Sequence, residues 1–221
     1  MRETWDALAS GDTATYVGDP ARGREELDAL FGRLGADPHG GFVVEVGCGP
    51  GRMTAALAER FDRVLGLDVS PVMVVRAREA VPVASVEFRA IAGERLEGVA
   101  DGSVDALVCY LVLQHLPSVD HVLGYVREFG RVLAPDGEAF VQLPVLDRGL
   151  VPRAWRAART AALPLAGRDA NRSAAFRGTR VTDDELARGL REAGLRVVVR
   201  DTGPDAPYRF ATDVFLRLGR A

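Results

Sequence analysis

The chain has 221 residues, of which 48% are apolar, and a formal net charge of −3. This length favours one domain with a large core, and the apolar content argues against disorder. This small net charge does not indicate any general class of binding partner. No apolar run reaches the roughly 18 residues of a membrane span, and the N-terminus lacks the apolar core of a signal peptide. We therefore expect a cytoplasmic protein.

The chain begins with two expected helices, at residues 3–9 and 22–35, which form an N-terminal cap over residues 1–40. Strands and helices alternate after this cap, with strands at 42–46, 63–67, 85–90, 104–109 and 138–143 and helices at 51–60, 71–80 and 119–133. Alternation with continuously apolar strands is typical of a parallel sheet covered on both faces. Ser70-Pro71 predicts the start of a helix, and Pro135-Asp136-Gly137 predicts a turn after one.

The alternation breaks over residues 144–180, an expected insertion whose helix runs over 152–163 with Pro152 in its first turn. Thr182 and Glu185 have the spacing of a capping box, so the next helix is expected to start there and to end before Gly194. Strands at 195–200 and 208–218 then complete a single domain over residues 1–221.

The most informative segment is the alternating-glycine stretch after the first strand. It contains Gly47, Gly49 and Gly51, with Glu45 two residues before the first. Glycines at this spacing let the backbone turn tightly and approach a ligand closely. An acid here would repel a pyrophosphate at a helix N-terminus, but it suits a cationic ligand with an ammonium and a sulfonium. The alternative is a plain strand–helix turn with a solvated Glu45.

This stretch and the segments after it, over residues 41–144, resemble the class I S-adenosylmethionine-dependent methyltransferases. The resemblance implies an α/β fold, a Rossmann-like three-layer sandwich. Its sheet would be mostly parallel, with seven strands in the order 3-2-1-4-5-7-6 and the last strand antiparallel. The implied cofactor is S-adenosylmethionine, and the implied activity is methyl transfer to an O or N atom of a small molecule, with residues 144–180 as a substrate lid. A non-catalytic cofactor-binding protein on this fold is the alternative.

The resemblance also implies cofactor contacts beyond the glycines and Glu45. Asp68 ends the second strand, 17 positions after Gly51, where an acid can accept hydrogen bonds from the ribose hydroxyls; a role at the start of the next helix is the alternative. Other implied contacts lie in the glycine turn, beside the adenine and at the end of the fourth strand: Cys48, Val69, Met73, Cys109 and Tyr110.

The adenine contact departs from the family pattern. Many relatives carry an Asp before the fourth strand, where this chain has Ala92. The backbone around Gly93 or the side chain of Glu94 is therefore expected to replace it, unless Glu94 is merely a surface residue. Tyr16, in the N-terminal cap, could reach the cofactor carboxylate or simply pack there.

Methyl transfer needs alignment of acceptor, methyl and sulfur, and a general base only where the acceptor must lose a proton. His115, after the fourth strand, is the candidate base, with cofactor or substrate contact and a structural role as alternatives. Gln114 could position the acceptor. We expect no metal site, because Cys48 and Cys109 lack metal-ligand spacing.

The segment from Arg148 to Arg180 contains eight arginines and one acid. Arg153, Arg156 and Arg159 recur at helical spacing, so they share one helix face. This face could attract an anionic substrate, or it could be a solvated face in a chain that has no lysine. The expected partners are a small-molecule substrate and, at most, a second copy in a homodimer. Nucleic acid is not expected.

Overall fold

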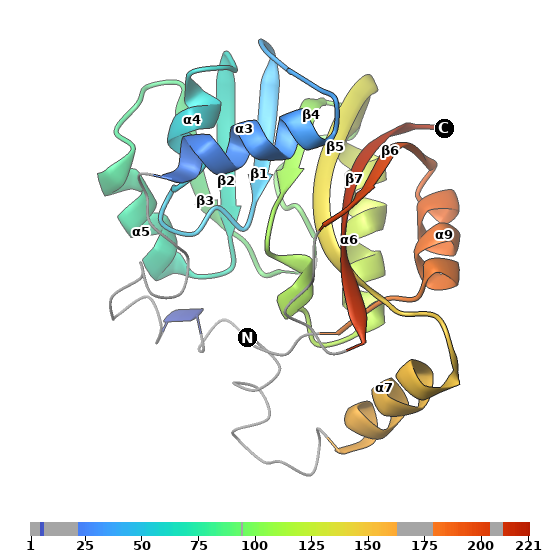
Figure 1. Ribbon diagram of the computed structural model, residues 1–221. Helices are drawn as coiled ribbons and strands as arrows, with labels where there is room; N and C mark the ends of the chain where they lie inside the picture. Colours follow the sequence, from blue (N-terminus) through green and yellow to red (C-terminus); the bar gives the residue numbers. More distant parts are fainter. Residues whose placement is uncertain (1–4, 7–21, 94, 163–178, 204–209) are drawn as a thin grey trace.

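The computed structural model describes residues 5–6, 22–93, 95–162, 179–203 and 210–221 (Figure 1). Its strands are β1 (Phe42–Val46), β2 (Arg63–Asp68), β3 (Val86–Ala90), β4 (Val104–Cys109), β5 (Leu133–Leu146), β6 (Leu195–Thr202) and β7 (Ala211–Arg220). They form one sheet in the order β3-β2-β1-β4-β5-β7-β6. β1 to β5 pair in parallel, and β7 is antiparallel to both β5 and β6. The predicted strand order and directions are confirmed.

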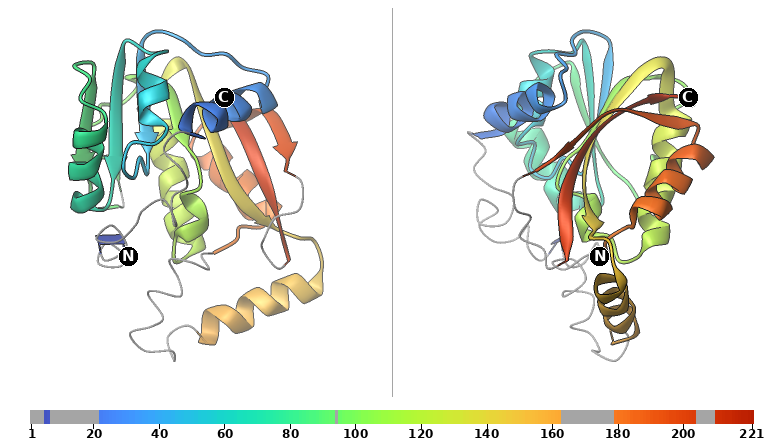
Figure 2. Two further views of the ribbon diagram at one scale, coloured as in Figure 1. Left: turned by 60° about the vertical axis from the view of Figure 1, so that its left-hand side comes forward. Right: turned by 45° about the vertical axis from the view of Figure 1, so that its right-hand side comes forward.

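Helices cover both faces of the sheet, as Figure 2 shows with the sheet seen nearly edge-on. On one face lie α3 (Gly23–Arg33), α4 (Thr54–Ala58) and α5 (Pro71–Ala80), and on the other α6 (Val119–Val132) and α9 (Asp183–Glu192). Consecutive residues of β1 face the two cores: Val43 belongs to the cluster that contains Phe31 of α3, and Val44 to the cluster that contains Phe129 of α6. The continuously apolar strands therefore do face two buried layers.

The helix α7 (Leu150–Ala162) follows β5 and lies beyond the end of the sheet, at the bottom of Figure 1. No helix in the described part of the chain is both long and apolar enough to cross a membrane.

Several predicted boundaries are wrong by two or three residues, among them the start of α7, the end of β5 and the end of β7. Two larger differences have a clear structural reason. The helix expected at 51–60 is only α4, because residues 51–53 still belong to the turn that follows β1. β5 begins at Leu133 instead of residue 138, because α6 leads directly into pairing with β4. Between the pairs Val104–Leu133 and Ala106–Glu138 the register shifts, so Pro135-Asp136-Gly137 forms a bulge within β5.

Two predicted helix starts, at Ser70-Pro71 and at Thr182, are confirmed by side-chain caps. The Ser70 hydroxyl accepts a hydrogen bond from Met73 N at 3.2 Å, with Pro71 in the first turn. Thr182 and Glu185 form the complete capping box of α9, in which each side chain accepts from the other residue's backbone N–H. These caps satisfy backbone donors that a helix start otherwise leaves without partners.

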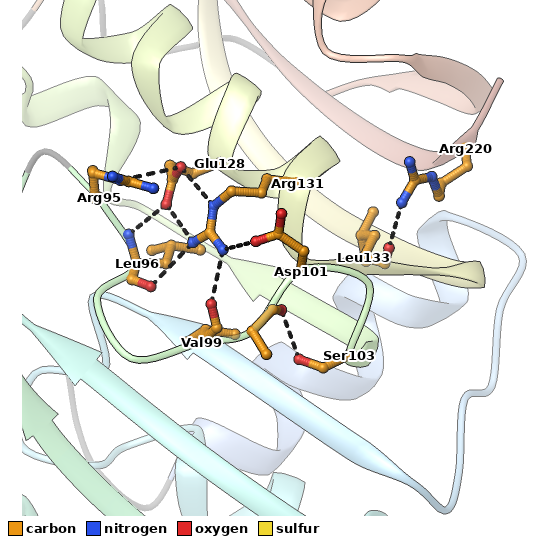
Figure 3. A network of polar contacts seen from close by, with 10 residues as sticks. Arg95, Leu96, Val99, Asp101, Ser103, Glu128, Arg131, Leu133 and Arg220 are labelled. Atoms are coloured by element: carbon orange, nitrogen blue, oxygen red, sulfur yellow. Dashed lines mark hydrogen bonds and ion pairs between the residues drawn. The ribbon is translucent and has the colours of Figure 1, made fainter.

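Arg131, near the end of α6, holds the loop that joins β3 to β4 (Figure 3). Its guanidinium donates to both carboxylate oxygens of Glu128, at 2.8 and 2.6 Å, and to Asp101 at 2.6 Å. It also donates to the carbonyl oxygens of Val99 and Leu96. The loop backbone is thereby fixed against α6, although most of it has no strand or helix of its own.

Candidate functional site

A cavity of about 310 Å³ lies at the carboxyl ends of β1, β2 and β4. Its wall is built from the glycine turn after β1, the end of β2 with the start of α5, and the segment from β4 into the short helix η2 (Leu113–His115). This is the edge where parallel α/β sheets bind ligands, since adjacent loops diverge there.

Most of the predicted site residues meet at this cavity. Those that line it are Glu45, Gly47, Cys48, Gly49, Asp68, Val69, Met73, Tyr110, Gln114 and His115. Gly51, Gly93 and Cys109 do not: Gly51 packs near Val81, Gly93 near Val69, and Cys109 is fully buried in the core. Tyr16 and Glu94 lie outside the described residues.

The glycine turn wraps around the end of β2. Gly47 N and Cys48 N both donate to the carbonyl oxygen of Leu67, at 2.7 and 3.0 Å. Gly47 and Gly49 have φ of +73° and +52°, a backbone conformation that favours glycine. A Cβ on Gly47 would lie 2.2 Å from Val112 Cγ2, whereas a Cβ on Gly49 would have no atom within 4 Å. The turn is therefore tight at Gly47 and open at Gly49.

Asp68 joins this turn to α5. Its Oδ2 accepts from Gly49 N at 2.9 Å and its Oδ1 from Ser70 N at 2.8 Å. Burial raises the pKa of Asp68, and these backbone hydrogen bonds oppose the shift. Each carboxylate oxygen has two lone pairs, so Asp68 keeps acceptor capacity toward the cavity.

Glu45 is a buried acid with a hydrogen-bond partner on α4. Its side chain is only 5% exposed, and its Oε2 accepts from Thr54 Oγ1 of α4 at 2.5 Å. Burial raises the pKa of Glu45 to about 8, so the neutral form is favoured at neutral pH. The assignment of Glu45 to a ligand ammonium stays a prediction, and the hydrogen bond from Thr54 uses only part of the acceptor capacity of this carboxyl.

Trp5, Gln114 and His115 form the other end of the cavity. The Trp5 and His115 rings meet edge-on, with centroids 5.1 Å apart. Gln114 Nε2 lies 3.1 Å from His115 Nε2. With the Gln114 amide in this orientation, its nitrogen can donate to an imidazole that carries its proton on Nδ1. That tautomer could accept a proton at Nε2.

Comparisons with known proteins agree with this geometry. A family model described as "Methyltransferase domain" matches residues 44–141. Ubiquinone biosynthesis O-methyltransferase of Xanthomonas oryzae pv. oryzae is 32% identical over 178 residues, which cover 77% of this chain and 68% of that protein. The chain belongs to the S-adenosylmethionine-dependent methyltransferase family.

The protein of the same name from Pseudomonas aeruginosa is 30% identical over 160 residues, covering 70% of this chain. The match spans 64% of that relative's length, less than two thirds of it. N-methyltransferase NodS from Bradyrhizobium japonicum, solved with S-adenosyl-l-homocysteine, has a TM-score of 0.67 at 17% identity, covering 99% of this chain and 97% of NodS. A chain from the complex of the Haloferax volcanii Trm112 methyltransferase activator with a methyltransferase scores 0.70 at 20% identity, covering 98% of each. At these identities, the two structures show that this family member shares their fold.

Several cavity residues of this family member could not be found from its sequence. They include Trp5, Glu26, Arg52, Met53 and Tyr125. Glu26 and Arg52 look like ordinary surface charges on helix-forming segments, and Tyr125 lies in the apolar repeat of α6 like any core residue. These residues line the same cavity only because the folded chain packs α3 and α6 near the ends of the strands.

The arginine face of α7 has acidic partners in this family member. Arg156 donates to both oxygens of Glu185, at 2.6 and 3.0 Å, with each side chain 22% exposed. Arg148 and Arg153 pair with Asp183 and Asp184, at 3.3 and 3.4 Å. These acids belong to the first turn of α9, so Arg153 and Arg156 join α7 to α9, and two of the three arginines of the predicted face have acidic partners.

Proposed function

We propose that the chain is an enzyme that transfers a methyl group from S-adenosylmethionine to an oxygen or nitrogen atom of a small molecule. The observation that carries this proposal is that one cavity is lined by the glycine turn and Asp68 as well as by Gln114 and His115. The residues suited to the cofactor and the pair Gln114 and His115, which is suited to an acceptor, thus line the same cavity.

The residues at the cavity fit the cofactor. Asp68 retains acceptor capacity for ribose hydroxyls, and Val69 and Met73 offer an apolar wall for the adenine. The open space at Gly49 leaves room for a ligand beside the backbone. Gly93 and Glu94 remain the proposed adenine contacts, since Ala92 lacks the side chain that many relatives use.

When bound, the cofactor supplies a methyl group on a positively charged sulfur. The protein's own residues then align the acceptor and exclude water. Gln114 would orient the acceptor, and His115 Nε2 would take its proton, with the acceptor replacing the Gln114 amide as donor at that nitrogen. The curated relatives are named as O-methyltransferases, which favours a hydroxyl acceptor, and a hydroxyl must lose a proton.

The prediction of an anionic acceptor came from the arginine-rich segment, in which Arg148, Arg153 and Arg156 have carboxylate partners. Arg168, Arg172 and Arg177 lie outside the described residues, so an anionic acceptor stays a prediction. A neutral or phenolic acceptor fits the largely apolar wall that Trp5, Leu111 and Leu116 contribute.

Calorimetric titration with S-adenosylmethionine tests the cofactor. We expect binding in the micromolar to millimolar range that weakens by about tenfold or more in Asp68→Asn, because a charged ribose acceptor is lost. Asp62→Asn is the matched control, since Asp62 is exposed at the opposite end of β2. Absence of binding to the unchanged protein would end the proposal.

Catalysis is tested by formation of S-adenosylhomocysteine with a pool of phenolic, hydroxylic and amine acceptors. Turnover that falls at least about 100-fold in His115→Ala, with cofactor affinity retained, supports His115 as the base. Binding without turnover of any acceptor would instead favour the second candidate, a non-catalytic cofactor-binding protein.

A further inference from the structure

A line of polar side chains runs from β7 through β5 to His115. Gln142 of β5 donates from its Nε2 to Asp213 of β7 at 2.6 Å, and the same nitrogen lies 3.4 Å from Gln114 Oε1. Gln114 Nε2 in turn lies 3.1 Å from His115 Nε2. Two amides therefore connect a partly buried carboxylate on β7 to the candidate base at the cavity.

The direction of the Gln142 amide is fixed by two groups that cannot exchange roles. Its Oε1 accepts from the backbone N–H of Leu111 at 3.1 Å, and a backbone N–H can only donate. On the other side, an ionised Asp213 can only accept. Reversing the amide would break both hydrogen bonds. Because Gln142 is fully buried, polar groups left there without partners would be costly.

The fixed amide orients the next one. The nitrogen of Gln142 carries two N–H groups, of which one donates to Asp213 and the other faces Gln114. Gln114 must then turn its oxygen toward Gln142, which leaves its own nitrogen facing His115. A donor at that place requires an Nε2 without a proton, so neutral His115 carries its proton on Nδ1.

We propose that Gln142 is a positioning residue that sets the tautomer of His115 through Gln114. Leu111 N–H and Asp213 fix the direction of the Gln142 amide, and Nε2 of His115 is thereby kept ready to take the proton of an acceptor. The catalytic meaning of this inference rests on the proposed function. The tautomer itself can be measured without cofactor or acceptor.

Nitrogen NMR of the three histidines tests the tautomer directly. Protonated and unprotonated ring nitrogens differ widely in chemical shift, and the signals of His115 are those that disappear in His115→Gln. At a pH where the ring is neutral, His115 should show a protonated Nδ1 and an unprotonated Nε2. A neutral ring with its proton on Nε2 in the unchanged protein would overturn the proposal without any variant.

The double variant Gln142→Glu/Asp213→Asn exchanges the amide and the carboxylate at constant net charge. The carboxylate on β5 can still accept from Leu111 N–H and now accepts from the amide on β7. It can offer Gln114 only an acceptor, so the Gln114 amide reverses and presents its oxygen to His115. We expect the proton to move to Nε2 and turnover of a hydroxyl acceptor to fall at least about 100-fold. Affinity for S-adenosylmethionine should stay within about threefold.

Asp213→Asn alone is the matched control for the tautomer. Leu111 N–H still fixes the Gln142 amide, and the side-chain oxygen at position 213 can still accept from it, so the proton should stay on Nδ1. If the double variant does not fold, Gln142→Met gives the second test, because an unoriented Gln114 should allow both tautomers.

A proton that stays on Nδ1 in a folded double variant, or in Gln142→Met, would show that Gln142 does not set the tautomer, and the proposed function would stand. The converse result is also distinct. If the tautomer reverses as expected but the unchanged protein does not bind S-adenosylmethionine, the proposed function fails and the positioning role of Gln142 is retained.

Discussion

Gln142 of β5 accepts a hydrogen bond at 3.1 Å from the backbone N–H of Leu111, whose φ is +59°. A left-handed conformation costs a non-glycine residue about 1 kcal/mol, and it persists where surrounding contacts over-determine it. The Gln142 side chain is fully buried and also donates to Asp213 at 2.6 Å and to Gln114 at 3.4 Å. One amide thus sets both the bend after β4 and the place of Gln114.

Gln142→Met should lower the free energy of unfolding by about 2–4 kcal/mol, because Leu111 N and Asp213 lose their buried partner. Affinity for S-adenosylmethionine should stay within about threefold, since Asp68 and the glycine turn lie at the other end of the cavity. Urea unfolding and calorimetry measure the two quantities. An equal loss in both would contradict a local role at the acceptor end.

Gln142→Glu separates the two hydrogen bonds. Its carboxylate can still accept from Leu111 N, but it faces Asp213, whose pKa burial already raises. At low pH one of the two carboxyls is protonated and can donate to the other. As pH rises both ionise and repel. The variant should therefore lose stability with rising pH more steeply than the unchanged protein. Equal pH dependence would show that the bond to Asp213 contributes little.

Glu45 predicts a pH dependence of stability in the absence of cofactor. Its pKa is raised to about 8 in the folded protein, against about 4.3 in an unfolded chain. Between these values only the folded state retains the proton, so stability falls as pH rises through this window, by at most about 1.4 kcal/mol per pH unit. Glu45→Gln should remove that slope. Parallel urea-denaturation profiles for the two proteins from pH 5 to 9 would contradict the burial of an uncharged Glu45.

Gly47→Ala and Gly49→Ala should differ in what they damage. At Gly47 a methyl meets Val112 Cγ2 and the φ is positive, so we expect a loss of roughly 2–4 kcal/mol in stability. At Gly49 the methyl has open space, so only the backbone cost of about 1 kcal/mol applies. Because Gly49 lines the cavity, its methyl should weaken S-adenosylmethionine binding about tenfold or more. Thermal unfolding together with calorimetry distinguishes the two effects, and a reversed order would contradict the geometry of the turn.

Arg131→Met should destabilise the protein by about 2–4 kcal/mol, because it removes the guanidinium that donates to both oxygens of the buried Glu128 and frees the loop before β4. Arg127→Met is the matched control: it makes the same substitution one turn earlier on α6, at an exposed position. It should change stability by less than about 0.5 kcal/mol. Similar unfolding midpoints for both variants would mean that the network in Figure 3 carries little energy.

Local signals in the sequence were sufficient for most elements and for part of the site. Alternating glycines after an apolar strand, Ser70-Pro71, and the Thr182–Glu185 box each act within a few residues, so their structures could be predicted directly. Asp68 and His115 could be assigned to one site because the carboxyl ends of parallel strands meet at one edge of the sheet. The strand order required the family resemblance, since alternation alone does not specify which strands are neighbours.

Tertiary packing decided what those residues can do. The pairs Glu26–Arg52, Leu111–Gln142 and Arg156–Glu185 join residues that are far apart in sequence and whose contact depends on which helices and strands meet. Burial likewise changed the chemistry of Glu45, an acid in the sequence whose folded surroundings favour the protonated form. Sequence determined the types and order of the groups, because backbone preferences are local. Only the folded chain determined their partners and charge states, because desolvation and long-range contacts arise when the layers close.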